Sequence, residues 1–383
     1  MTIVVCKVLL GAMLTLFNFS TTVNSSAAQE GTVRQNAAAP SNAPRIENAK
    51  METRRVAETL AATMAEVEKT AASPMWVGYS VKSVQGERTI CCGKYIDSRA
   101  EGCGRCELEA DRDHWNNSSN EKSARAVKLE GGEQLTVLFR LQDRHLTRVK
   151  VASEDCVLDA GGLTFIWLTE VKPSESVAFL GGYVREKGAD ERGKHSIGNE
   201  ALTAIALHDG QEAEGVLESF TAPGQPEELR KHAAFWLGAA RGKEGLAALQ
   251  RMAKKDPSNE VRAQVAFALS ISKEPAALEE MIRMAHEDES GHVRGQAIFW
   301  LAQKAGKRAV SAIDSAIASD PDTDVKKQAV FALSQLPKDE GVPKLIQVAE
   351  NNRNPEVRKQ AMFWLGQSQD PRALGFFEKV LLK

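Results

Sequence analysis

The sequence has almost no net charge and only one long apolar run. Lys and Arg number 49 against 51 Asp and Glu, so the formal net charge is −2. A chain without an excess of positive charge has no bulk field that would hold nucleic acid. With 383 residues, 43% hydrophobic and 26% charged, it has the composition of a globular protein of two or three domains. We therefore expect no nucleic-acid partner.

The one apolar run spans residues 8–19, behind Lys7, and a polar stretch then ends in Ser26, Ala27 and Ala28. This order predicts a secretory signal peptide over residues 1–28. The alternative is an uncleaved membrane anchor, but the run is shorter than the roughly 20 residues that cross a bilayer. We expect a secreted or periplasmic protein with no stable membrane insertion after cleavage.

No recognisable catalytic motif occurs in the sequence: it has no Ser-His-Asp set, no phosphate-binding glycine loop and no H-E-x-x-H. We therefore predict no catalytic residue, no metal ligand and no cofactor.

After signal cleavage an odd number of cysteines remains, so at least one has no partner within the chain. The candidates for disulfides are Cys91, Cys92, Cys103, Cys106 and Cys156. Cys103-Gly-Arg-Cys106 also has the spacing of a zinc knuckle or a thiol-redox pair. Adjacent Cys91 and Cys92 fit poorly around one ion, and the redox pair lacks a preceding strand, so structural disulfides are favoured. We expect one of them to include Cys156.

The residue composition and pattern change several times in the first half of the chain. Residues 29–50 are rich in Ala, Asn, Pro and Ser and predict a flexible linker. Residues 51–72 carry apolar side chains at intervals of three or four, as an amphipathic helix requires. Residues 73–190 predict a small antiparallel β-domain, with strands near 76–81, 126–129, 135–140, 145–151 and 163–168. Glycines and polar residues over 187–194 mark its end.

From residue 228 the sequence repeats without a gap, always at the interval that separates Leu229 from Val261. One stack of equivalent positions holds Leu229, Val261, Val293, Val325 and Val357; a second holds Leu246, Leu278, Val310, Val342 and Leu374. Each unit therefore predicts two helices. Ile197, Ala201 and Ile205 fit an additional upstream copy, so we predict a solenoid over residues 196–383.

The phrases Val-Arg-x-x-Val-x-x-Ala-Leu from Val261 and Val-Arg-x-x-Ala-x-x-Trp-Leu from Val293 and Val357 resemble HEAT repeats, especially those of the phycobilisome lyases. Tetratricopeptide repeats have a similar length but a different pattern of aromatic residues and proline. The resemblance implies a right-handed α-solenoid with one helix of each hairpin on the concave face. Together with the Cys-containing β-domain that precedes it, this gives a mainly α chain. HEAT-fold hydroxylases hold two iron ions with several His-Glu pairs, whereas His286-Glu287 is the one such pair in this solenoid.

Position seven of each first helix, counted from Leu229, is always Phe: Phe235, Phe267, Phe299, Phe331 and Phe363. A helical wheel places this position far from the core centre, about 10 Å from the next Phe in the stack. Position eight alternates between Trp and Ala and is predicted to be core. The Phe residues therefore form either lateral packing between repeats or an exposed groove for a peptide or helix.

Polar side chains flank the Phe positions and would serve the groove. They are Lys231, Lys327 and Lys359 at position three, and Gln264, Gln296, Gln328 and Gln360 at position four. His232 stands where the other repeats have Gln and is predicted to be a surface variant.

Position two is basic in each repeat: Arg230, Arg262, Arg294, Lys326 and Arg358. We expect these side chains to cap carbonyls or pair with the acids that start the same helices, Glu228, Glu260, Asp324 and Glu356.

Two functions remain at this stage. The favoured one is a non-catalytic scaffold that binds a protein partner on the concave face of the solenoid. The alternative is a lyase-like or thiol-redox enzyme that uses the solenoid groove or Cys103 and Cys106.

Overall fold

The computed structural model describes residues 44–85, 89–91, 94–96, 106–109, 133–154, 156–188, 196–305 and 307–382. The predicted signal peptide, residues 29–43 of the predicted linker and the strand expected at 126–129 lie outside these ranges; residues 46–47 and 50, also assigned to the linker, are in strands. In the described part, no helix has the length and apolar character needed to cross a membrane.

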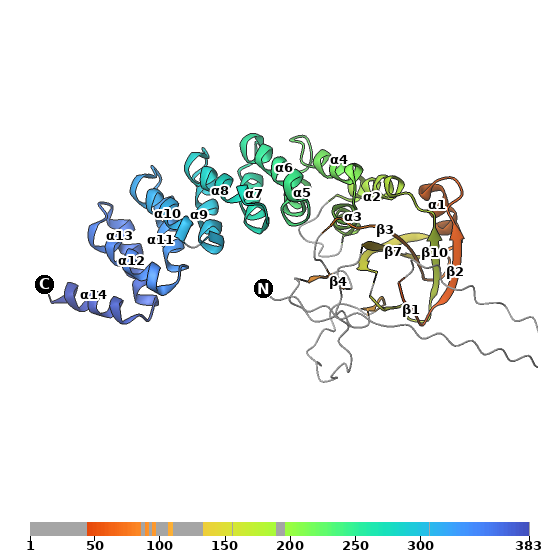
Figure 1. Cartoon of the computed structure of the whole chain (residues 1–383), viewed down its shortest axis with the longest axis horizontal. Coiled ribbons are helices and arrows are strands. Elements are labelled where there is room, and N and C mark those ends of the chain that lie inside the picture. The colour runs from red at the N-terminus through yellow and green to blue at the C-terminus, as the bar shows by residue number, and fades with distance from the viewer. Residues whose placement is uncertain are drawn as a thin grey trace, which may run out of the picture. The chain divides into compact units, whose positions relative to one another are not determined.

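A five-stranded sheet, in the order β2-β10-β3-β7-β8, organises the N-terminal region (Figure 1). Its strands are β2 (Lys50–Arg55), β3 (Met75–Lys82), β7 (Gln134–Gln142), β8 (His145–Ser153) and β10 (Thr164–Thr169). The sheet is mixed, not antiparallel as expected, because β10 runs parallel to both β2 and β3. The middle four residues of β10 are buried, and such a continuous apolar run is typical of a strand covered on both faces.

The amphipathic helix expected over residues 51–72 is shorter than predicted. Residues 50–55 form the edge strand β2, and helix α1 spans only Leu60–Thr70. The side chain of Thr59 accepts a hydrogen bond from the amide of Ala62 and so caps the start of α1. The extended segment therefore ends before the helix. Leu60, Met64 and Val67 are buried against the sheet, so the periodicity located the helix but not its start.

A second, smaller core lies on the other side of the sheet and includes the side chains of Cys106 and Cys156. Three short strands border it, β1 (Ile46–Glu47), β6 (Cys106–Glu107) and β9 (Leu158–Asp159), and a further pair consists of β4 (Thr89–Cys91) and β5 (Lys94–Ile96). The side chains of Cys91, Cys92 and Cys103 lie outside the described part of the chain. The disulfide pattern therefore stays a prediction.

Helix α2 (Pro173–Lys187) follows the sheet and was not expected from the sequence. Val177, Leu180 and Val184 of α2 join the main core. The helix ends at Gly188, whose positive φ of 66° suits glycine. This end coincides with the polar boundary seen in the sequence.

Six helical hairpins follow among the described residues from 196 onward (Figure 1). Their helices are α3 (Ile197–Leu207), α4 (Gln211–Ser219), α5 (Glu227–Ala240), α6 (Gly242–Lys255), α7 (Asn259–Ile271), α8 (Ala276–Glu287), α9 (Gly291–Ala305), α10 (Lys307–Ser319), α11 (Thr323–Ser334), α12 (Lys338–Asn351), α13 (Pro355–Gln367) and α14 (Pro371–Leu381). The first helix of each hairpin packs directly on the first helix of the next. The upstream copy is thus a full hairpin.

A chain of buried polar groups joins the sheet to α2 and α3. The Tyr79 hydroxyl lies 2.6 Å from Ser176 Oγ, which lies 2.8 Å from His208 Nε2. His208 Nδ1 lies 2.6 Å from the carbonyl oxygen of Ala204, so Nδ1 donates and Nε2 accepts. Burial lowers the pKa of His208 to about 4. The imidazole is therefore neutral at pH 7.

Candidate functional site: an aromatic row along the solenoid

The five Phe residues at position seven are connected by three Trp residues into one row of ring contacts. We call these eight side chains the aromatic row: in order of contact, Trp236, Phe235, Phe267, Trp300, Phe299, Phe331, Trp364 and Phe363. Successive ring centroids lie between 4.6 Å, for Phe267 and Trp300, and 6.1 Å, for Phe235 and Phe267. Pairs at such distances attract beyond the burial of their area.

Two kinds of junction alternate along the row. In the direct junctions, α5–α7 and α9–α11, Phe stacks on Phe, and Phe299 and Phe331 are 6.0 Å apart at an interplanar angle of 4°. In the indole-filled junctions, α7–α9 and α11–α13, a Trp ring lies between two Phe rings. The uniform spacing of the Phe rings expected from the sequence is therefore wrong, because Trp occurs only in every second repeat.

Gly238 allows α5 and α7 to pack closely at the first direct junction. A Cβ atom at Gly238 in α5 would lie only 2.2 Å from the carbonyl oxygen of Ala268 in α7. Real Cβ atoms do not approach an oxygen so closely, so any larger residue would push the two helices apart. The stack of Phe235 on Phe267 depends on this contact.

The aromatic row is half-buried along most of its length. Neither core cluster among the described residues includes its Phe side chains, whereas Trp236, Trp300 and Trp364 pack partly buried against the main core. Position eight was predicted to be core: Ala268 and Ala332 are fully buried there, whereas the Trp side chains are only partly buried against the core. The last ring, Phe363, is 54% exposed. The row therefore combines lateral packing with an accessible edge.

The predicted lysines stand beside the aromatic row, and two of them are paired within their own helix. Lys231 lies 2.7 Å from Glu228, and Lys327 lies 2.8 Å from Asp324. The hydrogen bond that the Lys327 ammonium donates to Asp324 raises the pKa of Lys327. Lys359 is exposed.

The four glutamines are half-buried. Gln328 Oε1 is buried and has no hydrogen-bond partner in the described part of the chain. A Cβ atom at Gly295 would overlap this side chain, so the glycine at position three of α9 makes room for Gln328. In α5, His232 Nδ1 lies 3.0 Å from the side-chain oxygen of Asn199.

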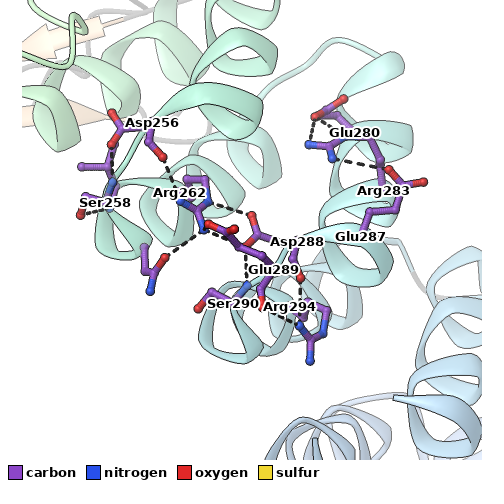
Figure 2. A network of polar contacts seen from close by, with 12 residues as sticks. Asp256, Ser258, Arg262, Glu280, Arg283, Glu287, Asp288, Glu289, Ser290 and Arg294 are labelled. Carbon is purple, nitrogen blue, oxygen red and sulfur yellow. Dashed lines mark hydrogen bonds and ion pairs between the residues drawn. The ribbon is translucent and has the colours of Figure 1, made fainter. Parts of the chain in front are cut away.

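Of the basic residues at position two, Arg230, Arg262 and Arg294 are buried, whereas Lys326 and Arg358 are half-buried. Figure 2 shows the polar contacts of Arg262 and Arg294. Arg262 Nε and Nη2 donate to the carboxylate of Asp288 at 2.9 and 3.0 Å, and Arg294 makes the same pair with Asp320 at 2.8 and 2.9 Å. The Arg262 Nη1 also donates to the carbonyl oxygen of Asp256. Both predicted roles, ion pairing and carbonyl capping, are thus present.

The acids that pair with these arginines are not the ones expected. The partners lie 26 residues downstream, at the C-terminal ends of the second helices, instead of at the start of the same helix. Arg230 likewise lies 3.2 Å from Asp256. Burial raises the pKa of Asp320, but the hydrogen bonds from Arg294 and from the backbone amide of Asp322, together with the nearby positive charges, hold the pKa below its usual value. We call Arg230–Asp256, Arg262–Asp288 and Arg294–Asp320 the Arg–Asp pairs.

Sequence reasoning missed one polar cluster on the sheet. Glu109 accepts hydrogen bonds from Trp76 Nε1 at 2.7 Å and from Arg140 Nε at 2.9 Å. The buried ammonium of Lys150 donates to the carbonyl oxygen of Leu108 and lies 5.4 Å from the Trp76 ring centroid. These residues clamp the Cys-containing segment onto the sheet. They lie in non-repeating sequence, which carries no signal for such long-range pairs.

The described residues offer little for catalysis. They contain no group of three or more His, Cys, Asp or Glu side chains that could hold a metal ion. In the His286-Glu287 pair, Glu287 instead lies 3.6 Å from Arg283, which also binds Glu280 (Figure 2). Cys106 is disulfide-bonded and only 1% exposed, whereas a cysteine that takes part in thiol exchange must be accessible.

Comparisons with known proteins were made over the whole chain. Residues 214–302 and 311–383 match the family of HEAT repeats. Comparison with curated proteins gives no match.

Solved structures with a similar arrangement share little sequence. Human deoxyhypusine hydroxylase is 17% identical, with 54% of this chain and 90% of that chain covered and a TM-score of 0.28. The complex of CpcE and CpcF of phycocyanin lyase from a Nostoc species is 19% identical, with coverage of 41% and 98% and a TM-score of 0.32. Kap95p, in its structure with RanGDP, is 16% identical, with coverage of 51% and 30% and a TM-score of 0.32. None of these likenesses carries an activity or a partner over to this chain.

The stacked hairpins, with their repeated apolar positions and Arg–Asp pairs, define an α-solenoid. The matched part of this solenoid, residues 214–302 and 311–383, consists of HEAT repeats. Such arrays are typically protein-interaction scaffolds and not enzymes.

Proposed function

We propose that this protein is a non-catalytic scaffold that binds a protein partner along the aromatic row. The observation that carries the proposal is the row itself, in which eight aromatic rings in contact span five repeats. Large, rigid aromatic side chains with an accessible edge are the residues that dominate protein interfaces. A polypeptide partner matches the row better than a small ligand, because the row extends along the repeats instead of converging on one cavity.

The flanking polar groups support a polypeptide partner. The peptide backbone of a partner needs both donors and acceptors, and side-chain amides such as Gln264, Gln296 and Gln360 offer both. The exposed Lys359 adds a positive charge beside Phe363. We expect the partner to contact this end of the row most directly, because Phe363 is its most exposed ring.

A photo-cross-linking residue at position 363 tests the proposal. The full chain would carry the cross-linker at Phe363 or, as the matched control, at Val380, which is 45% exposed on α14. The extract of the native compartment would then be irradiated with each protein. We expect one partner to be cross-linked from position 363 and not from position 380, and to be lost when Phe299 is changed to Ala. Equal labelling from both positions would contradict the proposal.

We also propose that the mature protein acts in a periplasm or outside the cell. The support is the apolar run at residues 8–19 and the small residues that end at Ala28. Sequencing of the N-terminus of the protein purified from its native source tests this. A mature chain that begins near Gln29 is the expected result, and an intact Met1 would contradict it.

A further inference from the structure

Basic side chains cover the C-terminal ends of the first helices at two junctions of the solenoid. At α3–α5, Arg241 Nη2 donates to the carbonyl oxygen of Ile205 at 3.1 Å. At α7–α9, the Lys304 ammonium donates to the carbonyl oxygens of Leu269, at 3.4 Å, and Ser272. Ile205 and Leu269 occupy equivalent positions, two repeats apart. Both junctions also belong to the class in which the following helix carries a Trp, Trp236 or Trp300.

The third junction of this class, α11–α13, has no basic side chain in that place. Two repeats after Leu269 and Ser272 stand Leu333 and Leu336, and two repeats after Lys304 stands Ser368. A cavity of about 180 Å³ occupies the site, and Leu333, Leu336, Trp364 and Ser368 line it. The short Ser368 side chain donates to the carbonyl oxygen of Leu365 in its own helix.

Trp364, whose side chain lines the cavity, also carries an unsatisfied donor. Trp364 Nε1 is buried and has no hydrogen-bond partner in the described part of the chain. A buried N–H without an acceptor is costly, so an occupant that brings an acceptor is favoured. The cavity is smaller than the roughly 300 Å³ at which ligand pockets usually begin, so one side chain fits it better than a cofactor.

The end of α11 favours a cation. The last carbonyl groups of a helix carry partial negative charge, and they accept the hydrogen bonds that an ammonium or guanidinium group donates. The face of the Trp364 ring attracts the same kind of group. Lys338 also lines the cavity and is itself exposed; its charge opposes a second cation there.

We propose that this cavity binds a lysine or arginine side chain of the protein partner. The inference rests on the proposed function, because Trp364 belongs both to the aromatic row and to the cavity wall. A partner that lies along the row inserts the basic side chain that Arg241 and Lys304 supply from within the chain at the two other junctions. Its adjoining peptide carbonyl is the acceptor that the Trp364 N–H lacks.

A titration monitored by nuclear magnetic resonance tests the site without the partner. The probe is Nα-acetyl-lysine methylamide, and the matched control probe is Nα-acetyl-norleucine methylamide, which has no ammonium group. The readout is the indole N–H cross-peak of Trp364, assigned with Trp364→Phe. We expect a saturable shift with the lysine probe and at least about tenfold weaker binding of the norleucine probe, since the bonds to the ammonium group are charge-assisted.

Three variants separate the cavity from its surroundings, and a fourth tests the opposing charge. Ser368→Lys introduces a lysine at the position equivalent to Lys304, and its side chain should fill the cavity. The lysine probe should then no longer shift the cross-peak. Ser368→Ala leaves the cavity open and should respond like the wild type. Lys304→Ser opens an equivalent site, so the cross-peak of Trp300 should begin to respond. Lys338→Gln should tighten binding because it removes an opposing charge.

Several results would overturn the proposal: no saturable shift of Trp364, equal binding of both probes, or a shift with butyrate that Lys338→Gln abolishes, which would indicate an anion site. If Ser368→Lys does not fold, the titrations of the wild type and Ser368→Ala still decide. A partner that is lost with Phe299→Ala but binds Ser368→Lys as tightly as wild type would leave the proposed function intact and refute only the basic anchor.

Discussion

Buried polar groups are arranged differently in the sheet region and in the solenoid. In the sheet region the chain of Tyr79, Ser176 and His208 is neutral, and its members come from distant parts of the sequence. In the solenoid the Arg–Asp pairs are charged and recur at one separation of 26 residues. A repeated charge can be satisfied by a repeated partner, whereas each buried group of a unique fold needs its own solution: His208 is neutral, and the Lys150 ammonium donates to the carbonyl oxygen of Leu108. The two regions should therefore fail under different conditions.

Removal of one acid from the Arg–Asp pairs should have the largest effect. In Asp320→Ala the guanidinium of Arg294 stays buried without its bidentate partner, and breaking such a pair costs about 3–5 kcal/mol. The control is Asp324→Ala, whose solvent-exposed pair with Lys327 should contribute far less to stability. Urea unfolding of both variants measures the difference. Equal losses would show that the buried pairs are no stronger than the surface pair.

A fall in pH should first weaken the hydrogen-bonded chain of Tyr79, Ser176 and His208 in the sheet region. The pKa of His208 is about 4 in the folded protein and 6.5 in its ordinary state, so the unfolded chain binds the proton more tightly. The stabilisation is complete above pH 6.5 and is lost as the pH falls to 4, about 3 kcal/mol in total. Unfolding by urea at several pH values measures this slope. In His208→Gln the slope over this interval should flatten; an unchanged slope would exclude His208 as its source.

The close approach at Gly238 should be the next most sensitive feature. Gly238→Ala places a Cβ atom against the carbonyl oxygen of Ala268, and such overpacking typically costs about 1–3 kcal/mol. Gly366 is the equivalent position in α13, and a Cβ there meets nothing within 4 Å. Gly366→Ala should therefore be neutral or slightly stabilising, because alanine favours helix. Melting temperatures of the two variants give the comparison.

The smallest expected difference is between two rings of the aromatic row. Phe299 lies between Trp300 and Phe331, so Phe299→Ala should cost about 1–3 kcal/mol, less than the 3–5 typical of a fully buried Phe. Phe363 is 54% exposed, and Phe363→Ala should cost less than about 1 kcal/mol. Urea unfolding of both variants gives the two losses. If Phe299→Ala is as mild as Phe363→Ala, lateral packing contributes little to the row.

The repeat made the solenoid predictable from the sequence. The stacks that begin at Leu229 and Leu246 located both helices of each unit, because every unit must bury the same positions. The acidic partners of the arginines could not be found among the acids that start the same helices, because they lie at the C-terminal ends of the second helices. Yet Asp256, Asp288 and Asp320 themselves stand one repeat apart, and that spacing was the available signal. In the next unit both members of the pair change: Lys326 stands in place of the Arg, and Asn352 stands in place of the Asp.

The sheet region could be predicted only in outline. Four of its strands were located from runs of apolar residues, but the parallel pairing of β10 with β2 and β3 depends on contacts between distant segments, which no local pattern encodes. Helix α2 was missed because the run of apolar residues around Val177 and Leu180 was assigned to the end of the β-domain. The cluster of Trp76, Glu109 and Arg140 carries no periodic signal.

The alternation of direct and indole-filled junctions makes four helices, not two, the unit by which this solenoid can grow or shrink. Deletion of two adjacent sequence repeats would join like junctions and leave every ring opposite its accustomed neighbour. Deletion of a single repeat keeps the helices in register but places two indole-filled junctions, or two direct junctions, in succession, so that one Phe ring exchanges a Phe neighbour for a Trp neighbour or the reverse. The sequence repeat and the packing repeat thus differ by a factor of two. An array of this design should gain or lose hairpins in pairs.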